Sequence, residues 1–119
     1  MGGKFIIEAV ETNPKATVLR VTGRLDIQTS QALFHKCRES LESNRLRLII
    51  NLSQVSFVAS SGVGTLLALT EEFKAAGGEL HLVSPSPAVQ SVIGPLNLAQ
   101  FLTIGESESE VLQAIDQEL

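Results

Sequence analysis

The sequence predicts an α/β fold in which about four helices cover a small mixed sheet of four to five strands. Strand patterns alternate with helix patterns along the 119 residues, and this alternation is typical of sheets whose strands are joined through helices. Only a turn separates the first two strand patterns, which favours an antiparallel hairpin. The later strands follow helices and should be parallel, with right-handed crossovers. The length fits a single domain over residues 1–119.

The hairpin and the first helix are predicted from the N-terminal third of the chain. Residues 5–10 form the first predicted strand, and residues 16–22, rich in Val, Leu and Thr, form the second. Residues 12–15 (Thr-Asn-Pro-Lys) have turn chemistry. The first helix follows, and either Thr29 or Ser30 could begin it as an N-cap. Its apolar face is predicted to hold Leu33, Phe34, Cys37 and Leu41.

The middle of the chain predicts a buried strand, a long helix and a further strand. Residues 46–52 are nearly all apolar after Arg47, which favours a central strand covered on both faces. The second helix starts near the pair Ser60-Ser61 and ends at Gly77-Gly78, and residues 79–83 form the next strand. The inward face of this helix is predicted to hold Val63, Leu66, Leu67, Thr70 and Phe73.

The C-terminal third predicts two shorter helices and a last strand. Ser86 and Pro87 are typical of an N-cap and of the first helical residue. Residues 101–104 form a short strand, and residues 107–110 (Ser-Glu-Ser-Glu) have capping-box spacing before the final helix. Pro95 should shorten the third helix, whose predicted inward residues are Val89, Val92, Ile93 and Leu96.

Composition and charge argue against several classes of function. The net charge is −4, the pI is about 5.1, and no Lys/Arg run is present, so we expect no direct binding to nucleic acid. The chain has no Trp or Tyr, the usual stacking platforms. The start of the sequence shows no signal peptide and apolar runs are short, so we expect a cytoplasmic protein without membrane insertion.

The residues that could bind metal or carry catalysis form no convincing set. His35 and Cys37 are two positions apart on a helix and do not face one another, so we expect no metal site. His81 lies in a predicted strand, where a structural or surface role is expected. Cys37 is the only cysteine and cannot form an internal disulfide. We therefore expect no enzyme activity and no cofactor.

Topology nevertheless predicts one candidate site. Ligand contacts in open α/β sheets collect beyond the carboxyl ends of parallel strands, so the segments 23–26 and 58–62 should share one edge. Asp26 and Ser60 would then be neighbours. Glycine inside a helix costs about 1 kcal/mol relative to alanine, so close approach by the sheet or by a partner should compensate at residues 62 and 64. From local chemistry alone, Ser60 or Ser61 could equally be an ordinary N-cap.

Three segments carry a family resemblance. Residues 23–26 (Gly-Arg-Leu-Asp), 59–64 (Ala-Ser-Ser-Gly-Val-Gly) and 86–89 (Ser-Pro-Ala-Val) resemble the STAS-domain family, and in particular the bacterial anti-sigma factor antagonists. The resemblance covers nearly the whole chain and implies that Ser60 is the residue phosphorylated by a partner kinase. The residues that it implies in partner binding or in shaping the site are Gly23, Asp26, Ala59, Ser61, Gly62, Val63 and Gly64.

One departure from the family pattern concerns the residue before the serine pair. The family usually has Asp at this position, whereas this chain has Ala59. The carboxylate beside the target hydroxyl is therefore missing. The change of Leu to Val63 is milder.

The resemblance implies a binding module switched by phosphorylation. The unphosphorylated form would bind an anti-sigma factor serine kinase and release a sigma factor, and a phosphoserine phosphatase would be a further partner. One alternative is a STAS scaffold, or the accessory subunit of a lipid or anion transporter, which Ala59 slightly favours. Another is a small nucleotide-binding α/β protein, although the segment 62–64 lacks the third glycine of a dinucleotide fingerprint.

Overall fold

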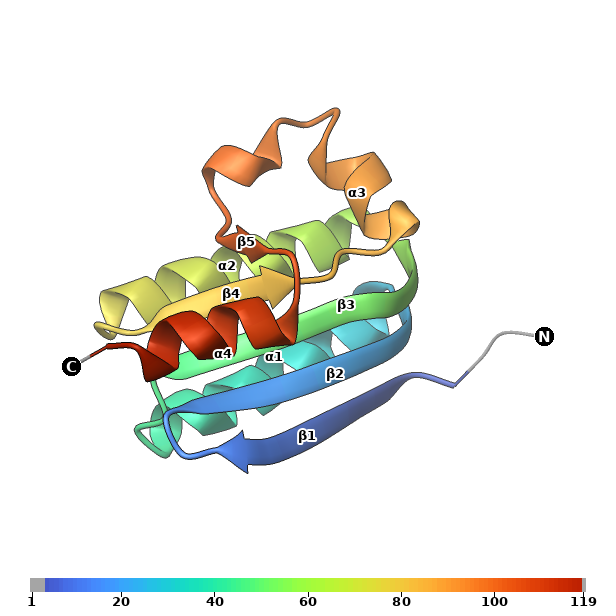
Figure 1. Cartoon of the computed structure of the whole chain (residues 1–119). Helices are drawn as coiled ribbons and strands as arrows, with labels where there is room; N and C mark the ends of the chain where they lie inside the picture. The colour runs from blue at the N-terminus through green and yellow to red at the C-terminus, as the bar shows by residue number, and fades with distance from the viewer. Residues whose placement is uncertain (1–3, 119) are drawn as a thin grey trace.

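The computed structural model describes residues 4–118 and contains a five-stranded mixed sheet in the order β1-β2-β3-β4-β5 (Figure 1). β1 and β2 form the predicted antiparallel hairpin, and β2 to β5 are parallel to one another. Residues 1–3 and 119 lie outside the described residues. The expected domain includes all four of them, and the expected absence of a signal peptide concerns residues 1–3. The strands are β1 (Ile6–Asn13), β2 (Ala16–Leu25), β3 (Arg47–Val58), β4 (Glu79–Val83) and β5 (Ile104–Gly105).

Helices cover both faces of the sheet, as predicted. α1 and α2 lie side by side on one face, and α4 lies on the other face (Figure 1). Within the described part of the chain, no helix has both the length and the apolar character needed to cross a membrane. The helices are α1 (Ile27–Glu42), α2 (Ser60–Ala75), α3 (Pro87–Ile93), the short 3₁₀ helix η1 (Leu98–Gln100) and α4 (Glu108–Asp116).

β3 is the central strand of the sheet and is buried on both of its faces. Leu48, Ile50 and Leu52 belong to the large apolar cluster beneath α1, α2 and α3. Ile49 points to the opposite face and joins the smaller cluster beneath α4. Side chains alternate between the two faces of a strand, so both faces must be covered to bury all four residues. The predicted central strand is thereby confirmed.

β2 and β3 both extend further than the sequence patterns predicted. β2 continues to Leu25 and β3 to Val58, and these two residues pair with one another. The extension arises from parallel pairing between the two strands, with two irregularities in register. Polar residues in 53–56 obscured this part of β3 in the sequence, although Val55 between them is buried.

The first helix begins earlier than predicted, because Asp26 is its N-cap. The Asp26 carboxylate accepts hydrogen bonds from the Gln28 and Thr29 amides, each at 3.0 Å. In return, the Thr29 hydroxyl accepts a hydrogen bond from the Asp26 amide at 2.8 Å. The prediction of Thr29 or Ser30 as the cap is wrong, and Thr29 instead completes a capping box around Asp26.

The buried face of α2 differs in part from the predicted face. Leu66, Thr70 and Phe73 are buried as predicted, but Val63 and Leu67 are only half-buried. Leu69, which the helical pattern did not select, is fully buried. The α1 face is closer to its prediction, since Leu33 and Cys37 are fully buried. The helix ends before Gly77, whose φ of +81° suits glycine.

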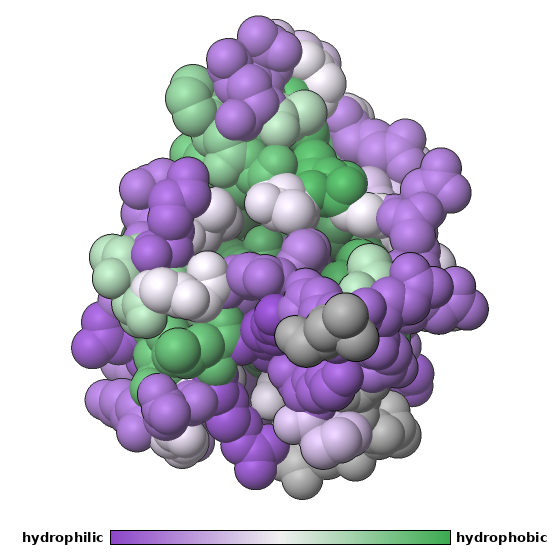
Figure 2. Space-filling view, turned by 60° about the vertical axis from the view of Figure 1, so that its left-hand side comes forward, coloured by the Kyte–Doolittle hydropathy of each residue, from purple (hydrophilic) through white to green (hydrophobic). Residues whose placement is uncertain are grey.

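The segment after β4 confirms one prediction and corrects two. Ser86 caps α3 through the Val89 amide, and Pro87 is its first residue. Leu96 is not buried but 60% exposed, because α3 ends at Ile93 before it. The expected strand at 101–104 is reduced to Ile104–Gly105. Figure 2 shows apolar surface in the upper part of the molecule, where this segment projects.

A polar network holds the start of α4 against the sheet. Arg20 of β2 donates from Nε and Nη2 to the two carboxylate oxygens of Glu108, each at 2.9 Å. Asn51 of β3 donates to the same carboxylate at 2.7 Å. The hydrogen bond from Arg20 is the main reason that the pKa of Glu108 is lowered, with a further contribution from Asn51.

Glu108→Gln is expected to lower the free energy of unfolding at pH 7 and to have little effect in acid. A carboxyl whose pKa is lowered by folding stabilises the fold above its unfolded-state value, near 4.5. This contribution is lost as the pH falls through the lower pKa of the folded state. Urea unfolding at pH 7 and near pH 3 measures the difference. The exposed Glu71→Gln on α2 is the control, and an equal loss for Glu108→Gln at both pH values would contradict the role of its charge.

Candidate functional site

The segments 23–26 and 58–62 meet at one edge of the sheet, which confirms the predicted juxtaposition. β2 and β3 end side by side, with Leu25 paired to Val58. The Ala59 amide then donates a hydrogen bond to the Leu25 carbonyl at 2.8 Å. Because α1 starts just after Leu25 and α2 just after Ala59, both helices have their N-termini at this edge.

Two glycines permit this close arrangement. A Cβ atom at Gly62 would lie 3.0 Å from the Leu25 carbonyl oxygen and 3.0 Å from a Val58 methyl carbon. Gly23 has a φ of +109°, and a Cβ atom there would lie 2.9 Å from the Lys4 carbonyl oxygen. Glycine is therefore needed at position 62 because the end of β2 approaches it closely. Glycine is needed at position 23 because Lys4, just before β1, approaches it closely.

Gly64 differs from both of these glycines. It is exposed within α2, and a Cβ atom there would have no neighbour within 4 Å. Packing within this chain therefore does not require glycine at this position. Of the two expected compensations, close approach by the sheet is confirmed for Gly62. At Gly64 the sheet makes no such approach, and close approach by a partner stays a prediction.

The start of α2 has no side-chain cap. Ala59 occupies the N-cap position, where a methyl group cannot accept a hydrogen bond from the first amides of the helix. Ser60 and Ser61 are the first two helical residues, so the interpretation of either serine as the N-cap is wrong. The Ser60 residue is exposed, whereas Ser61 is half-buried.

Asp26 places a negative charge at the same edge. Its pKa is lowered, first by the hydrogen bond from the Thr29 amide, and also by the Thr29 hydroxyl, the Gln28 amide and the charge of Arg24. The carboxylate is therefore ionised at neutral pH. Within the described residues, its carboxylate accepts hydrogen bonds only from the first turn of α1.

Apolar side chains that the sequence did not single out flank this edge. Ile27 is 67% exposed at the first position of α1, and Phe57 is 38% exposed near the end of β3. The Arg24 guanidinium lies over the Phe57 ring, 4.1 Å from its centroid. The available signal for Ile27 was an apolar residue directly after Asp26 and outside the predicted apolar face of the first helix.

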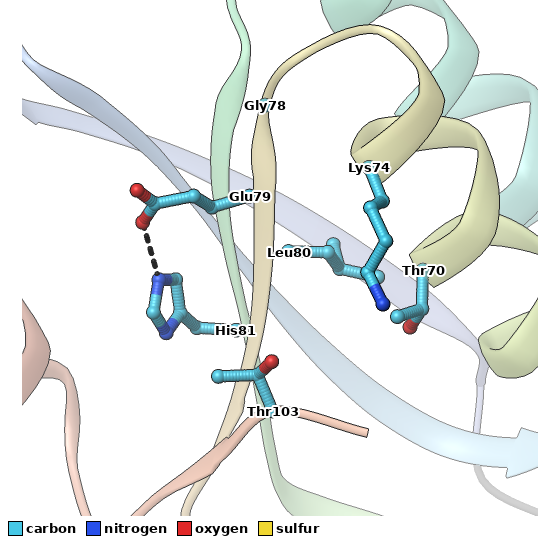
Figure 3. Close-up of a pocket in the computed structure, with 7 residues that line it drawn as sticks. All are labelled: Thr70, Lys74, Gly78, Glu79, Leu80, His81 and Thr103. Atoms are coloured by element: carbon cyan, nitrogen blue, oxygen red, sulfur yellow. Dashed lines mark hydrogen bonds and ion pairs between the residues drawn. The ribbon is translucent and has the colours of Figure 1, made fainter. Parts of the chain in front are cut away.

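A groove of about 280 Å³ lies at the opposite end of α2, near Lys74 and Gly78 (Figure 3). Within it, His81 Nε2 lies 2.8 Å from a carboxylate oxygen of Glu79, in line with the structural role expected for this histidine.

Burial raises the pKa of the Cys37 thiol to about 12. No cluster of three or more metal-ligating residues occurs within the part of the chain that the structure describes.

Ala59→Asp is expected to raise the free energy of unfolding by about 1 kcal/mol, because aspartate at the N-cap accepts hydrogen bonds from helix amides that alanine cannot satisfy. Urea unfolding at pH 7 measures the gain. Ala59→Leu is the control, since it adds volume without a hydrogen-bond acceptor. Equal free energies of unfolding for the Asp and Leu variants would show that water already satisfies the hydrogen bonds of the first backbone amides of α2.

Comparisons with known proteins identify a family and several relatives. The family model described as the STAS domain matches residues 9–111. An anti-sigma F factor antagonist from Lysinibacillus sphaericus is 31% identical over 104 residues, which cover 87% of this chain and 86% of the relative.

Two solved structures of SpoIIAA share the fold. The anti-sigma factor antagonist SpoIIAA in its unphosphorylated form has a TM-score of 0.78 at 24% identity, covering 96% of this chain and 99% of that chain. The Bacillus cell fate determinant SpoIIAA in its phosphorylated form has a TM-score of 0.72 at 24% identity, covering 92% of this chain and 99% of that chain.

Proposed function

Because this chain belongs to the STAS domain family, we propose that it is an anti-sigma factor antagonist switched by phosphorylation of Ser60. In its unphosphorylated form it binds an anti-sigma serine kinase, and the sigma factor held by that kinase is released. The chain is a substrate and a binding module rather than an enzyme. The observation that carries the proposal is the exposed Ser60 at a helix start without a side-chain cap, within a segment that resembles the family's phosphorylation motif apart from Ala59 and Val63.

The exposure of the two serines supports Ser60 as the phosphate acceptor. A kinase must bring the γ-phosphate of ATP to the serine oxygen, and the half-buried Ser61 offers less access than Ser60. The γ-phosphoryl group passes from ATP to the Ser60 oxygen, ADP leaves as its bond to the γ-phosphorus breaks, and the hydroxyl proton is released. A phosphoserine phosphatase would return the hydroxyl. SpoIIAA, which has the same fold, has been solved in a phosphorylated form, and this supports a phosphorylation switch in the present chain.

The surroundings of Ser60 support the direction of the switch. The apolar Ile27 and the stacked pair Arg24–Phe57 offer a contact surface at the same edge. A phosphate adds about −1.5 to −2 charges at pH 7, close to the ionised Asp26. A partner that covers this edge would have to remove water from both negative groups. Phosphorylation therefore weakens the complex through desolvation and repulsion.

Gly64→Ala is expected to stabilise the chain by up to about 1 kcal/mol and to weaken kinase binding. Alanine is a better helix former, and apart from the adjacent helix backbone its methyl group would have no described neighbour within 4 Å. The same methyl would stand between α2 and a partner that packs closely on this turn. Urea unfolding and calorimetric titration with the kinase measure the two effects. If Gly64→Ala binds the kinase with unchanged affinity, Gly64 does not belong to the proposed contact surface.

The central experiment incubates the chain with candidate anti-sigma kinases and ATP, followed by intact-mass analysis and site mapping by fragmentation. We expect one added phosphate on Ser60, none in Ser60→Ala, and normal labelling in Ser61→Ala. Pull-down of each variant tests binding separately from phosphorylation. Phosphate on Ser61, or no binding to any anti-sigma kinase of the host genome, would overturn the proposal.

A second candidate function is a scaffold or transporter-accessory STAS domain that is not switched. Ala59 favours it, because the carboxylate that the family usually places beside the target serine is missing. Ala59→Asp distinguishes the two functions in the same assay. A gain in phosphorylation rate supports a weakened switch, whereas no labelling of either form supports the scaffold.

A further inference from the structure

The outer edge of strand β1 pairs with no other strand among the described residues. β1 lies at the end of the strand order and pairs with β2 on its other side (Figure 1). Lys4 and Glu8 are exposed, and Ile6 between them is 50% exposed. A register irregularity after Val10 confines the regular part of this edge to its beginning. Open edges of this kind pair readily with another strand.

Residues 4–8, of which Lys4 and Phe5 directly precede β1 and the other three begin it, form a self-complementary pattern. If a second copy pairs antiparallel about a two-fold axis at Ile6, that residue lies opposite itself. Phe5 then lies opposite Ile7, and Lys4 lies opposite Glu8, each twice. Residues directly opposite one another share a face of the sheet, so two Lys–Glu pairs flank an Ile–Ile pair on one face. Two Phe–Ile pairs form on the other face.

Neighbouring registers lack this complementarity. Moving the axis to Ile7 places Ile6 opposite Glu8, and moving it to Glu8 places two like charges in contact. Among the described residues, the ion pair that Glu8 makes is a long one. Its carboxylate lies 3.9 Å from Arg20, and that arginine is engaged at 2.9 Å by Glu108.

We propose that this edge binds a second copy of the chain, so that two five-stranded sheets join into one continuous sheet through β1. Charge and apolar pairing favour a second copy of the chain as the partner, because residues 4–8 of one copy are complementary to residues 4–8 of the other. Phe5 and Ile7 already pack against the main core of one copy. Pairing them with their counterparts joins the two cores across the edge.

Charge reversal tests the register directly. Lys4→Glu places Glu opposite Glu, and Glu8→Lys places Lys opposite Lys, so each variant alone should self-associate at least 10-fold more weakly than the native chain. A 1:1 mixture of the two variants should form a heterodimer, because each Lys then faces a Glu. Sedimentation velocity of the full chain at 10 µM to 1 mM gives the dissociation constants. Lys36→Glu, exposed on α1, is the matched control.

A cross-linking experiment tests the position of the axis. Ile6→Cys places the two thiols opposite one another, and the native Cys37 is buried and does not compete. In the same register, two cysteines at position 10 would lie about 26 Å apart along the strands, too far for a disulfide. Oxidation should therefore link Ile6→Cys and leave Val10→Cys monomeric. Absence of native dimer up to 1 mM, no heterodimer in the mixture, or equal linking of both cysteine variants would overturn the proposal.

Discussion

Leu69→Ala is expected to lower the free energy of unfolding by about 2–5 kcal/mol, enough to unfold a marginally stable domain. Leu69 is fully buried in the cluster formed by the sheet, α1 and α2. Removing its side chain forfeits the transfer free energy of the lost methyl groups and leaves a cavity that packed neighbours fill only in part. Urea unfolding followed by far-ultraviolet circular dichroism measures the loss.

Leu67→Ala is the matched control, two residues away on the same helix. Leu67 is only half-buried, so the same chemical change should cost clearly less than Leu69→Ala. The comparison cancels differences in helix propensity because both substitutions replace leucine by alanine. An equal or larger loss for Leu67→Ala would mean that α2 is rotated relative to the described structure.

Ser60→Asp is expected to weaken binding to the cognate anti-sigma kinase by about 100-fold, equivalent to about 3 kcal/mol. The substitution places a charge in the contact surface that we propose and beside the ionised Asp26. It should not harm the fold, because aspartate is favourable in the first turn of a helix. Isothermal titration calorimetry measures the affinity, and unfolding in urea confirms that the stability is retained.

Ser60→Asn separates charge from size, since asparagine has nearly the same shape as aspartate but no charge. It should bind more tightly than Ser60→Asp, and Ser60→Ala should bind close to the native affinity. A rise in ionic strength should reduce the difference in kinase affinity between Ser60→Asp and Ser60→Asn. Equal loss in both variants would assign the effect to volume and would contradict an electrostatic switch.

The order of the elements was predictable because apolar periodicity is a local property of the chain. The ends of β2 and β3 were not, because Ser53, Gln54 and Ser56 are polar and pairing with β2 keeps this part of β3 in the sheet. The buried face of α2 was predictable only in part. Leu67 and Leu69 both fit a helical stripe, and the rotation of the helix about its axis depends on the close approach of Gly62 to Leu25.

At the candidate site, the sequence predicted the location better than the chemistry. Parallel crossovers placed Asp26 and Ser60 at one edge, and the structure has both segments there. The capping roles were misassigned because Asp, Ser and Thr are all good caps, and several of them occur within five residues. Ala59 was not recognised as an N-cap, since alanine has no side-chain acceptor and its position follows only from the backbone.

The hydrogen bond between the Ala59 amide and the Leu25 carbonyl has a consequence for the switch that we propose. This bond and the contact of Gly62 with Leu25 fasten the first turn of α2 to the sheet. A phosphate on Ser60 would therefore act on a partner through its electric potential rather than through a change of shape. Such a potential decays over about 8 Å at physiological salt. The groups of the partner that sense the phosphate would then lie within roughly two side-chain lengths of Ser60, and the salt concentration would set the range of the proposed switch.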